Sequence, residues 1–446
     1  MSIHKEVASM PRRRALQVLG ATGFGMLTGG LPPVTSAAES GFATPVLPEG
    51  QSAPRLARDE AFWREVADYY DRSDEIVNLE QGYWGQMARP VLESYQQATQ
   101  MVNTRNSWYA RRRYPADLQE STRRVATALG VESDEIVLTR NATEAVHALL
   151  LQYRGLQPGD KILYSDIDYP SFISTMRWLE QARGVQAIRL VIPNDAGRDQ
   201  LFSLYREAFL AHPQLKLALI THASNQNGLI IPVREISREA RQRGIDIICD
   251  CAQSWGLVDF TLPELEVDWA GFNLHKWIGS PVGVGALYMR RGSLERVAPY
   301  PGESDPQNRS VALRVHTATS NFAANLAIPA ALDFHQALGG ANKEARLRYL
   351  RNLWTSEARQ MSHIEVLGAG DEQSWSGIAS FRLAGRNSAQ DAQALQQILE
   401  QDYGIFTVAR YGLESGACVR VTPQVFTAAD EIGALIDAMS NLRSRV

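Results

Sequence analysis

The sequence predicts an α/β fold in which a mostly parallel β-sheet is covered by helices on both faces. From about residue 100 onward, short apolar runs of strand length alternate with segments that have helical spacing. Such an alternation is typical of parallel sheets, because the helices that connect parallel strands cover both faces and bury the strands. The 446 residues, of which 45% are hydrophobic, suffice for about two domains with substantial cores.

Each element of the predicted large domain is assigned from its local pattern. Apolar runs rich in β-branched residues predict strands. These strands are 135–140, 160–165, 216–222, 245–250, 267–273 and 283–291. Helical periodicity between them predicts helices over 142–153, from Ser171 onward and over 233–244. The last helix ends at Gly244, because glycine readily adopts the conformation that terminates helices.

The pattern changes after about residue 335 and predicts a smaller α+β domain. A long helical segment (342–361) is followed by the strand-like runs GIASFRL, YGIFTVAR and GACVRVTP and by a last helix from Ala428. We expect the segment before residue 100, which includes a helix over 57–71, to complete this domain. The predicted boundaries are 38–99 for an N-terminal arm with part of the small domain, 100–335 for the large domain and 336–446 for the C-terminal small domain.

Residues 1–37 have the pattern of an export signal. Three arginines (12–14) precede a mildly apolar run over 15–31, and small residues follow, with cleavage expected after Ala37 or Ala38. The pattern is typical of a signal read by the twin-arginine export machinery and predicts a periplasmic protein. The alternative is a disordered basic tail. Because this route carries folded proteins, the signal also indicates a cofactor that is bound before export.

The composition excludes some classes of function. A net charge of −4 argues against a general nucleic-acid binder, which would need an excess of Lys and Arg. Cys249 and Cys251 are two positions apart, and on a strand this spacing points both thiols to one face, where a mutual disulfide is awkward. We therefore assign both to the core. We predict no metal site.

Several polar groups are expected to meet at one rim of the large sheet. Ligands of open α/β sheets bind beyond the carboxyl ends of the strands. In this chain those ends are followed by RNATEA, DIDYP, ASNQNG, CDCAQSWG and NLHKW. They bring together a helix start, an aromatic ring, an amide, an acid and a lysine. The residues are Asn141, Ala142, Thr143, Tyr169, Asn225, Asp250 and Lys276.

The chemistry of these groups points to one ligand. The N–H groups at the helix start, with the Thr143 hydroxyl, can hold a phosphate. Asp250 can keep a heteroaromatic nitrogen protonated, and Tyr169 offers a flat face for stacking. Apolar surroundings lower the pKa of a lysine, which makes Lys276 nucleophilic and able to form a Schiff base with an aldehyde. A phosphate, a pyridine nitrogen and an aldehyde on one ring describe pyridoxal 5′-phosphate (PLP).

The motifs ICDCAQSWG, SNQNG and FNLHKWIGSPVGVGALYMR resemble the class V aminotransferase family, especially its isopenicillin N epimerase-like and cysteine desulfurase-like branch. The resemblance covers roughly residues 75–440. It implies a fold-type I PLP enzyme and a homodimer with active sites at the subunit interface. The cofactor-binding residues that it implies are Ala142, Thr143, Tyr169, Asn225, Asp250, Gln253, Asn273, His275, Lys276 and Thr319.

The resemblance also implies a role for the residues of this set. Lys276 and Asp250 are the catalytic pair, with Asp250 at the pyridine nitrogen. Ala142 and Thr143 hold the phosphate, Asn225 and Gln253 lie near the ring hydroxyl, and Tyr169 stacks on the ring. His275 lies beside the lysine, and Asn273 stands where relatives often have a phosphate-binding serine. Thr319 matches a threonine that reaches the phosphate bound by the partner subunit.

Two groups of arginines have open alternatives. Arg420, in CVRVTP, matches the arginine that grips a substrate carboxylate, and the alternative is a structural ion pair. Arg111, Arg112 and Arg113 form either a solvated helix face or the lining of an anionic substrate path.

The reaction type stays open, since PLP supports transamination, racemisation, decarboxylation and elimination. In the desulfurases a loop after the R-x-G element supplies a nucleophilic cysteine. Here Ser415 stands near that place and Cys418 comes later, so sulfur abstraction is not expected. The export signal and this branch together resemble the periplasmic tailoring enzymes of pyoverdine siderophores. These convert the glutamate attached to the chromophore to a succinamide or transaminate it to a keto acid. The alternatives are another exported activity on a small amino acid and a non-catalytic PLP-fold binding protein.

Overall fold

The computed structural model describes residues 44–303, 310–368 and 371–442. The predicted export signal, residues 1–37, lies outside these ranges. The three sheets described below belong to one unit, Ser36–Val446. No helix in the described part of the chain combines the length and the apolar character needed to cross a membrane.

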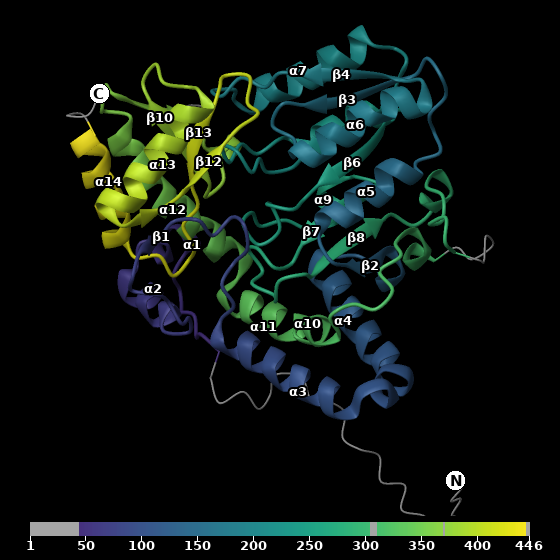
Figure 1. Ribbon diagram of the computed structural model, residues 1–446, viewed down its shortest axis with the longest axis horizontal. Coiled ribbons are helices and arrows are strands. Elements are labelled where there is room, and N and C mark those ends of the chain that lie inside the picture. Colours follow the sequence, from purple (N-terminus) through teal and green to yellow (C-terminus); the bar gives the residue numbers. More distant parts are fainter. Residues whose placement is uncertain (1–43, 304–309, 369–370, 443–446) are drawn as a thin grey trace, which may run out of the picture. The chain divides into compact units, whose positions relative to one another are not determined.

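A seven-stranded sheet forms the centre of the large domain, in the order β2-β8-β7-β6-β5-β3-β4 (Figure 1). All strands are parallel except β8, which is antiparallel to both of its neighbours. The strands are β2 (Ile136–Thr139), β3 (Lys161–Ser165), β4 (Gln186–Leu190), β5 (Leu215–Thr221), β6 (Asp246–Asp250), β7 (Trp269–Asn273) and β8 (Gly285–Met289). This mostly parallel sheet confirms the predicted α/β class.

Two layers of helices cover the sheet because alternate residues of each strand face opposite sides. Leu217 and Leu219 of β5 pack with α5 (Ala142–Gln152) and α6 (Pro170–Arg183). Ala218 and Ile220 of the same strand belong to the core on the other face. The helices of that second face are α4 (Tyr114–Leu129), α7 (Arg198–Ala211) and α8 (Val233–Gln242).

The remaining helices outside the smaller domain lie between the N-terminus and residue 338. They are α1 (Ala53–Leu56), α2 (Glu60–Ala67), α3 (Arg89–Arg112), α9 (Leu262–Leu265), α10 (Phe322–Leu326) and α11 (Ile328–Leu338). The helix expected over 57–71 is shorter than predicted, since Asp59 caps its start by accepting a hydrogen bond from the Phe62 N–H (3.2 Å). A non-helical Asn106 (φ 47°) interrupts α3.

The smaller domain is an antiparallel sheet in the order β12-β13-β10-β9 with three helices packed against it. The strands are β9 (Ile364–Leu367), β10 (Ala379–Leu383), β12 (Val408–Arg410) and β13 (Cys418–Val421), and the helices are α12 (Gly340–Ala358), α13 (Ala389–Tyr403) and α14 (Ala429–Asn441). A short strand from the N-terminal segment, β1 (Val77–Asn78), pairs in parallel with β11 (Ile405–Phe406). This pairing brings the residues after position 78 to the carboxyl ends of the large sheet.

Several elements have no counterpart in the sequence predictions, among them the helices α4, α7, α11 and α13 and the strands β4 and β9. Both strands lie at the edge of their sheets, and several of their side chains are partly exposed. Because these edge strands are only partly covered, polar residues occur within them. They therefore lack the continuous apolar run that identifies a buried strand.

Candidate active site

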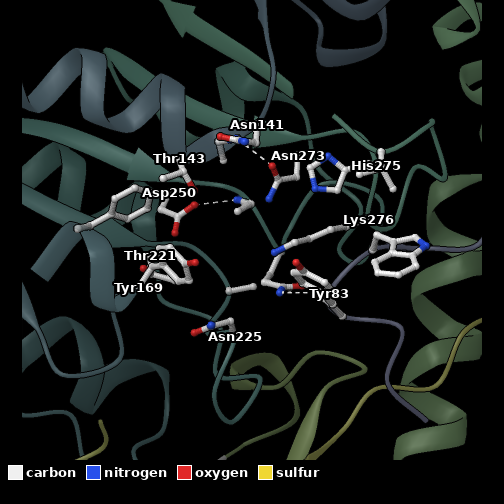
Figure 2. Close-up of a pocket in the computed structure, with 18 of the residues that line it drawn as sticks. Tyr83, Asn141, Thr143, Tyr169, Thr221, Asn225, Asp250, Asn273, His275 and Lys276 are labelled. Carbon is white, nitrogen blue, oxygen red and sulfur yellow. Dashed lines mark hydrogen bonds between the residues drawn. The ribbon is translucent and has the colours of Figure 1, made fainter. Parts of the chain in front are cut away.

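The carboxyl ends of β5, β6 and β7 border a cavity of about 430 Å³ (Figure 2). All of the site residues expected from the sequence line this cavity except Thr319. They are Ala142, Thr143, Tyr169, Asn225, Asp250, Gln253, Asn273, His275, Lys276 and Arg420. Thr319 lies elsewhere, and its neighbours Ala318 and Ser320 line a different cavity. Its role at the partner's phosphate stays a prediction.

Lys276 projects into the cavity from the loop that follows β7. Its amine has no hydrogen-bond or ion-pair partner among the described residues. Burial lowers the pKa of Lys276 to about 7, although the Asp250 carboxylate acts in the opposite direction. A large part of this lysine is therefore neutral near pH 7, which is the nucleophilic form of an amine.

The loop that carries Lys276 packs tightly against the N-terminal segment 80–86. The Gly85 N–H donates a hydrogen bond to the His275 carbonyl (2.8 Å). A Cβ atom at position 85 would lie 2.0 Å from the Lys276 carbonyl oxygen, so only glycine fits this close approach. The backbone on both sides of the lysine is thus held by a segment nearly 200 positions earlier in the chain.

Asp250 ends β6 and lines the same cavity (Figure 2). Its Oδ1 accepts a hydrogen bond from the Ala252 N–H (2.9 Å), whereas Oδ2 has no donor in the described structure. Burial raises the pKa of Asp250 to about 6, and both the Ala252 N–H and Lys276 oppose this shift. A protonated ring nitrogen beside Oδ2 would supply the positive charge that this buried carboxylate lacks.

The N-terminus of α5 also lines the cavity. Asn141 caps the helix by accepting a hydrogen bond from the Glu144 N–H, and Asn273 Oδ1 accepts one from the Ala142 N–H (2.8 Å each). The N–H and hydroxyl of Thr143 have no partner within the described residues. The Ala142 N–H, which was expected to bind phosphate, therefore donates to Asn273 instead. The N–H and the hydroxyl of Thr143 remain available to an anion at the positive end of the helix.

His275 is a neutral imidazole at the rim. Its Nδ1 donates to the Val284 carbonyl (2.9 Å), which leaves Nε2 as an acceptor. Burial, with a smaller effect from Lys276, lowers the pKa of His275 to about 4. Tyr169, which precedes α6, contacts Phe172 edge to face (5.3 Å between ring centroids) and is 40% exposed, so its ring face is open to a ligand.

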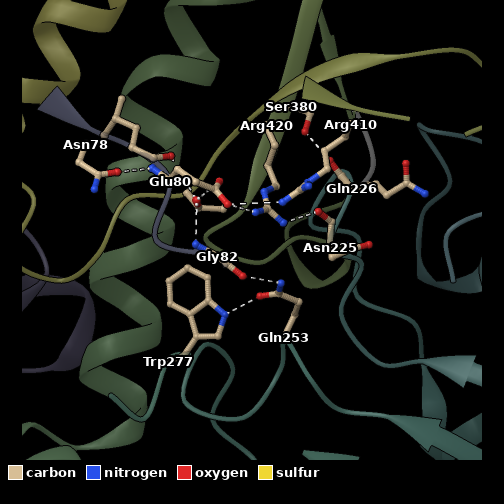
Figure 3. Close-up of polar contacts among 12 residues, drawn as sticks. Asn78, Glu80, Gly82, Asn225, Gln226, Gln253, Trp277, Ser380, Arg410 and Arg420 are labelled. Atoms are coloured by element: carbon tan, nitrogen blue, oxygen red, sulfur yellow. Dashed lines mark hydrogen bonds and ion pairs between the residues drawn. The ribbon is translucent and has the colours of Figure 1, made fainter. Parts of the chain in front are cut away.

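Gln253 connects the two segments that flank the lysine (Figure 3). Its Nε2 donates to the Gly82 carbonyl, and its Oε1 accepts from the indole N–H of Trp277 (2.9 Å each). The amide thus ties segment 80–86 to the Lys276 loop. Its predicted place near the ring hydroxyl stays a prediction.

Arg420 lines the cavity and already has protein partners (Figure 3). It donates to Glu80 Oε1 (2.5 Å) and to the Asn225 carbonyl (2.7 Å). The structural ion pair that was the alternative interpretation of Arg420 is therefore present, in a residue that also borders the cavity.

Sequence reasoning did not single out several lining residues. They are Gly82, Tyr83, Trp84, Arg140, Phe172, Thr221, Ala223, Ala252, Val282, Gly283 and Arg410. Thr221 ends β5 and could have been found by the strand-end rule. Its hydroxyl donates to Asp168 (2.7 Å), a buried acid whose pKa burial raises to about 7. No local pattern marks Tyr83, Trp84 or Arg410, since they reach the site through the small domain.

The family model for class V aminotransferases matches residues 85–428. The chain belongs to the class V aminotransferase family. An isopenicillin N epimerase from Streptomyces clavuligerus is 26% identical over 406 residues, which are 86% of this chain and 98% of that protein. A cysteine desulfurase from Haloferax volcanii is 25% identical, over 72% of this chain and 78% of its own length. These matches support the isopenicillin N epimerase-like branch.

Solved structures confirm the fold-type I architecture. An apo cysteine desulfurase from Thermococcus onnurineus NA1 matches with a TM-score of 0.73 and 20% identity, over 86% of this chain and 98% of the other. A C-DES mutant with glycine covalently linked to the PLP cofactor matches with a TM-score of 0.72 and 21% identity, over 82% and 97%. As a class V family member, this chain is a PLP-dependent enzyme.

The residues of the cavity fit this cofactor. Lys276 has a free amine, the buried carboxylate of Asp250 lacks a full counter-charge, and Thr143 presents two unpartnered groups at a helix N-terminus. Lys276 would hold PLP covalently, Asp250 would face its ring nitrogen and Thr143 its phosphate. When bound, PLP supplies an electron sink for a bond broken at the carbon that carries the substrate amine.

No cysteine lines the cavity in the part of the chain that the structure describes. Ser415 accepts a hydrogen bond from the Asn194 amide (2.6 Å), and Cys418 is fully buried on β13. Burial raises the pKa of the Cys418 thiol to about 11, which keeps it protonated. Cys249 and Cys251 are also buried and free, as predicted. Among the described residues, the site therefore lacks a cysteine nucleophile of the kind that the resemblance to desulfurases implied.

Proposed function

We propose that this chain is an exported PLP-dependent enzyme that modifies the glutamate attached to the chromophore of a pyoverdine siderophore, yielding a succinamide or, by transamination, a keto acid. The class of reaction follows from the family and from Lys276 and Asp250. The substrate rests on the size of the site and on the export signal.

The observation that carries the proposal is a second cavity beside the first. It has a volume of about 620 Å³ and shares Tyr83, Trp84 and Arg410 with the Lys276 cavity. Tyr83 and Trp84 are 68% and 49% exposed, and Phe406, Val408 and Phe426 add an apolar lining. A free amino acid would fill only the first cavity. The second offers room and aromatic surface for a bulky flat group attached to the amino acid.

The two products differ in which atoms of the glutamate they retain. A succinamide has four carbons and keeps the amine nitrogen, so the carboxyl group next to the amine leaves as CO₂. This route balances with one dioxygen consumed and one water released. Transamination keeps all five carbons, transfers the nitrogen to a keto acid and needs no oxidant. Both routes need a free amine for PLP chemistry, and the route to the succinamide also needs a free α-carboxyl, so we take the glutamate to be attached through its side-chain carboxyl.

The product test uses an immature pyoverdine whose glutamate carries ¹⁵N and a ¹³C-labelled α-carboxyl, incubated with holoenzyme in air and under nitrogen. If the product is the succinamide, we expect it to keep ¹⁵N and to lose ¹³C, and to form only in air. If the product is the keto acid, we expect it to keep ¹³C and to lose ¹⁵N, and to form when a keto acid is added as the nitrogen acceptor. The Lys276→Ala protein is the control. An unchanged mass in H₂O, with uptake of one deuterium at the α-carbon in D₂O, would instead indicate an epimerase, the activity named for two of the similar proteins. A siderophore with neither change would rule out the proposed substrate.

We also propose that PLP is loaded before export through the twin-arginine route. The support is the pair Arg12 and Arg13 before an apolar run, together with a cofactor site enclosed by segments from both halves of the chain. Replacing both arginines by lysine should leave active holoenzyme in the cytoplasm and unmodified siderophore outside. Fractionation with PLP fluorescence in each compartment measures this. Active enzyme in the periplasm of the double-lysine strain would contradict the export proposal.

A further inference from the structure

Two arginines and one glutamate meet where the small domain borders the cavity. Arg410 on β12 and Arg420 on β13 lie on the same face of the sheet, because Arg410 pairs with Cys418, two positions before Arg420. Glu80 comes from the N-terminal segment and is held in register with β13 by backbone hydrogen bonds of its neighbours Leu79 and Gln81 to Thr422 (2.8 and 3.1 Å).

Glu80 makes Arg420 part of the protein's own charge balance. One carboxylate oxygen accepts from Arg420 (2.5 Å) and the other from the Thr422 hydroxyl (3.2 Å). The side chain of Arg420 is fully buried and that of Glu80 is 7% exposed. If a substrate carboxylate bound Arg420 instead, Glu80 would remain as a buried carboxylate without its ion-pair partner. An unpaired buried charge of this kind is strongly unfavourable.

Arg410 is the less engaged of the two cations. It is 3.4 Å from the same Glu80 oxygen, and its side chain is 25% exposed, whereas that of Arg420 is fully buried. It also lines both cavities and thus stands at their junction. The cluster has two positive charges and one negative charge, so one positive charge remains for an anionic group, and its accessible part is on Arg410.

We propose that Arg410 binds the α-carboxylate of the substrate, and that Glu80 directs it there by keeping Arg420 in an internal ion pair. This inference rests on the proposed function, because it takes the substrate to be an amino acid with a free α-carboxylate. The site then selects an amino acid whose carboxylate lies at the junction of the cavities and whose attached group continues past Tyr83 and Trp84. Glu80 is a specificity-determining residue in this scheme, and Arg410 is the binding residue.

The test compares two probes on the holoenzyme: a γ-glutamyl anilide, which keeps the free amine and the α-carboxylate, and its α-carboxamide analogue. Binding is measured from the change in cofactor absorbance on titration, so no turnover is needed. We expect the wild-type protein to prefer the carboxylate probe by about 10- to 100-fold, as for a charge-assisted hydrogen bond. Arg410→Gln should reduce this preference to about 3-fold or less, with Arg410→Lys in between. An unchanged preference in Arg410→Gln would overturn the inference.

Glu80→Gln tests the second half of the inference. Glutamine has the same shape and still accepts a hydrogen bond from Arg420, so the variant is expected to fold. Without the negative charge of Glu80, Arg420 should become free to bind the substrate carboxylate. The preference for the carboxylate probe should therefore be at least about 5-fold higher in the double variant Glu80→Gln/Arg410→Gln than in Arg410→Gln alone. No recovery would overturn the role of Glu80. Because the probes report binding alone, an immature siderophore that stays unmodified would reject the proposed function and leave this result standing.

Discussion

Replacing Lys276 by alanine is expected to reduce turnover on the order of 10³-fold or more and to abolish covalent retention of PLP. Lys276 supplies the amine of the cavity, and no other lysine lines it in the described part of the chain. The guanidinium groups that line it, such as Arg420, remain protonated and cannot replace a neutral amine. The measurement is borohydride reduction of the holoenzyme followed by peptide mass analysis, with the yellow absorbance of the bound cofactor as a second signal.

The matched control is Lys216→Ala. Lys216 is an exposed lysine on β5, the strand that ends beside the cavity at Thr221. The control removes the same chemical group and should retain both colour and turnover. A Lys276→Ala protein in which reduction still attaches the cofactor to another lysine would show that the assignment of Lys276 is wrong.

Replacing Asp250 by asparagine should lower turnover by about 10²-fold or more while leaving the protein folded. The asparagine oxygen can still accept the hydrogen bond that Ala252 donates to Asp250, so the end of β6 keeps its local structure. The lost charge is the one that would hold a ring nitrogen protonated. Steady-state kinetics of the holoenzyme measure the effect, and near-normal turnover would indicate that the carboxylate has a structural role only.

A second measurement on the same variant separates the catalytic effect from stability. Burial raises the pKa of Asp250 from 3.8 to about 6 in the folded chain. The folded apoprotein thus binds this proton more tightly than the unfolded chain does, and this contribution to stability is present at low pH and lost as the pH rises to about 6. Asparagine does not titrate, so the stability of this variant does not fall in the same way as the pH rises. At pH 7 its apoprotein should therefore melt no lower than the wild type, although its turnover falls.

The charge of Asp250 and that of Lys276 are linked through the cavity that both residues line. Each opposes the effect of burial on the other, so that the pKa of the acid rises less and that of the lysine falls less than burial alone would give. Neither group has a strong ion-pair partner of its own among the described residues. The site thus holds an acid and an amine that are ready for a ligand which satisfies both.

The catalytic end of the site was predictable from the sequence because its residues come from the ends of successive strands. Once the alternation of strands and helices is recognised, the residues after β6 and β7 must lie at one rim, since parallel strands share a direction. Asp250 and Lys276 were found in this way, without any long-range contact. The same rule could have found Thr221 at the end of β5. It could not have shown that Asn273 takes the N–H of Ala142, because that bond depends on the distance between two loops.

By itself, the sequence determined the fold class, the cofactor and the residues expected to hold it. These follow from local periodicity, from the side chains at strand ends and from motifs of a few residues. Only the tertiary structure decided what stands at the opposite end of the cavity. Glu80 reaches Arg420 from 340 positions away, through the short β1–β11 pairing, and Gly85 fits against the Lys276 loop through a contact with no local signature. Such contacts join segments that are distant in the chain. Their geometry is set by how the small domain folds against the sheet, so neither composition nor spacing encodes it.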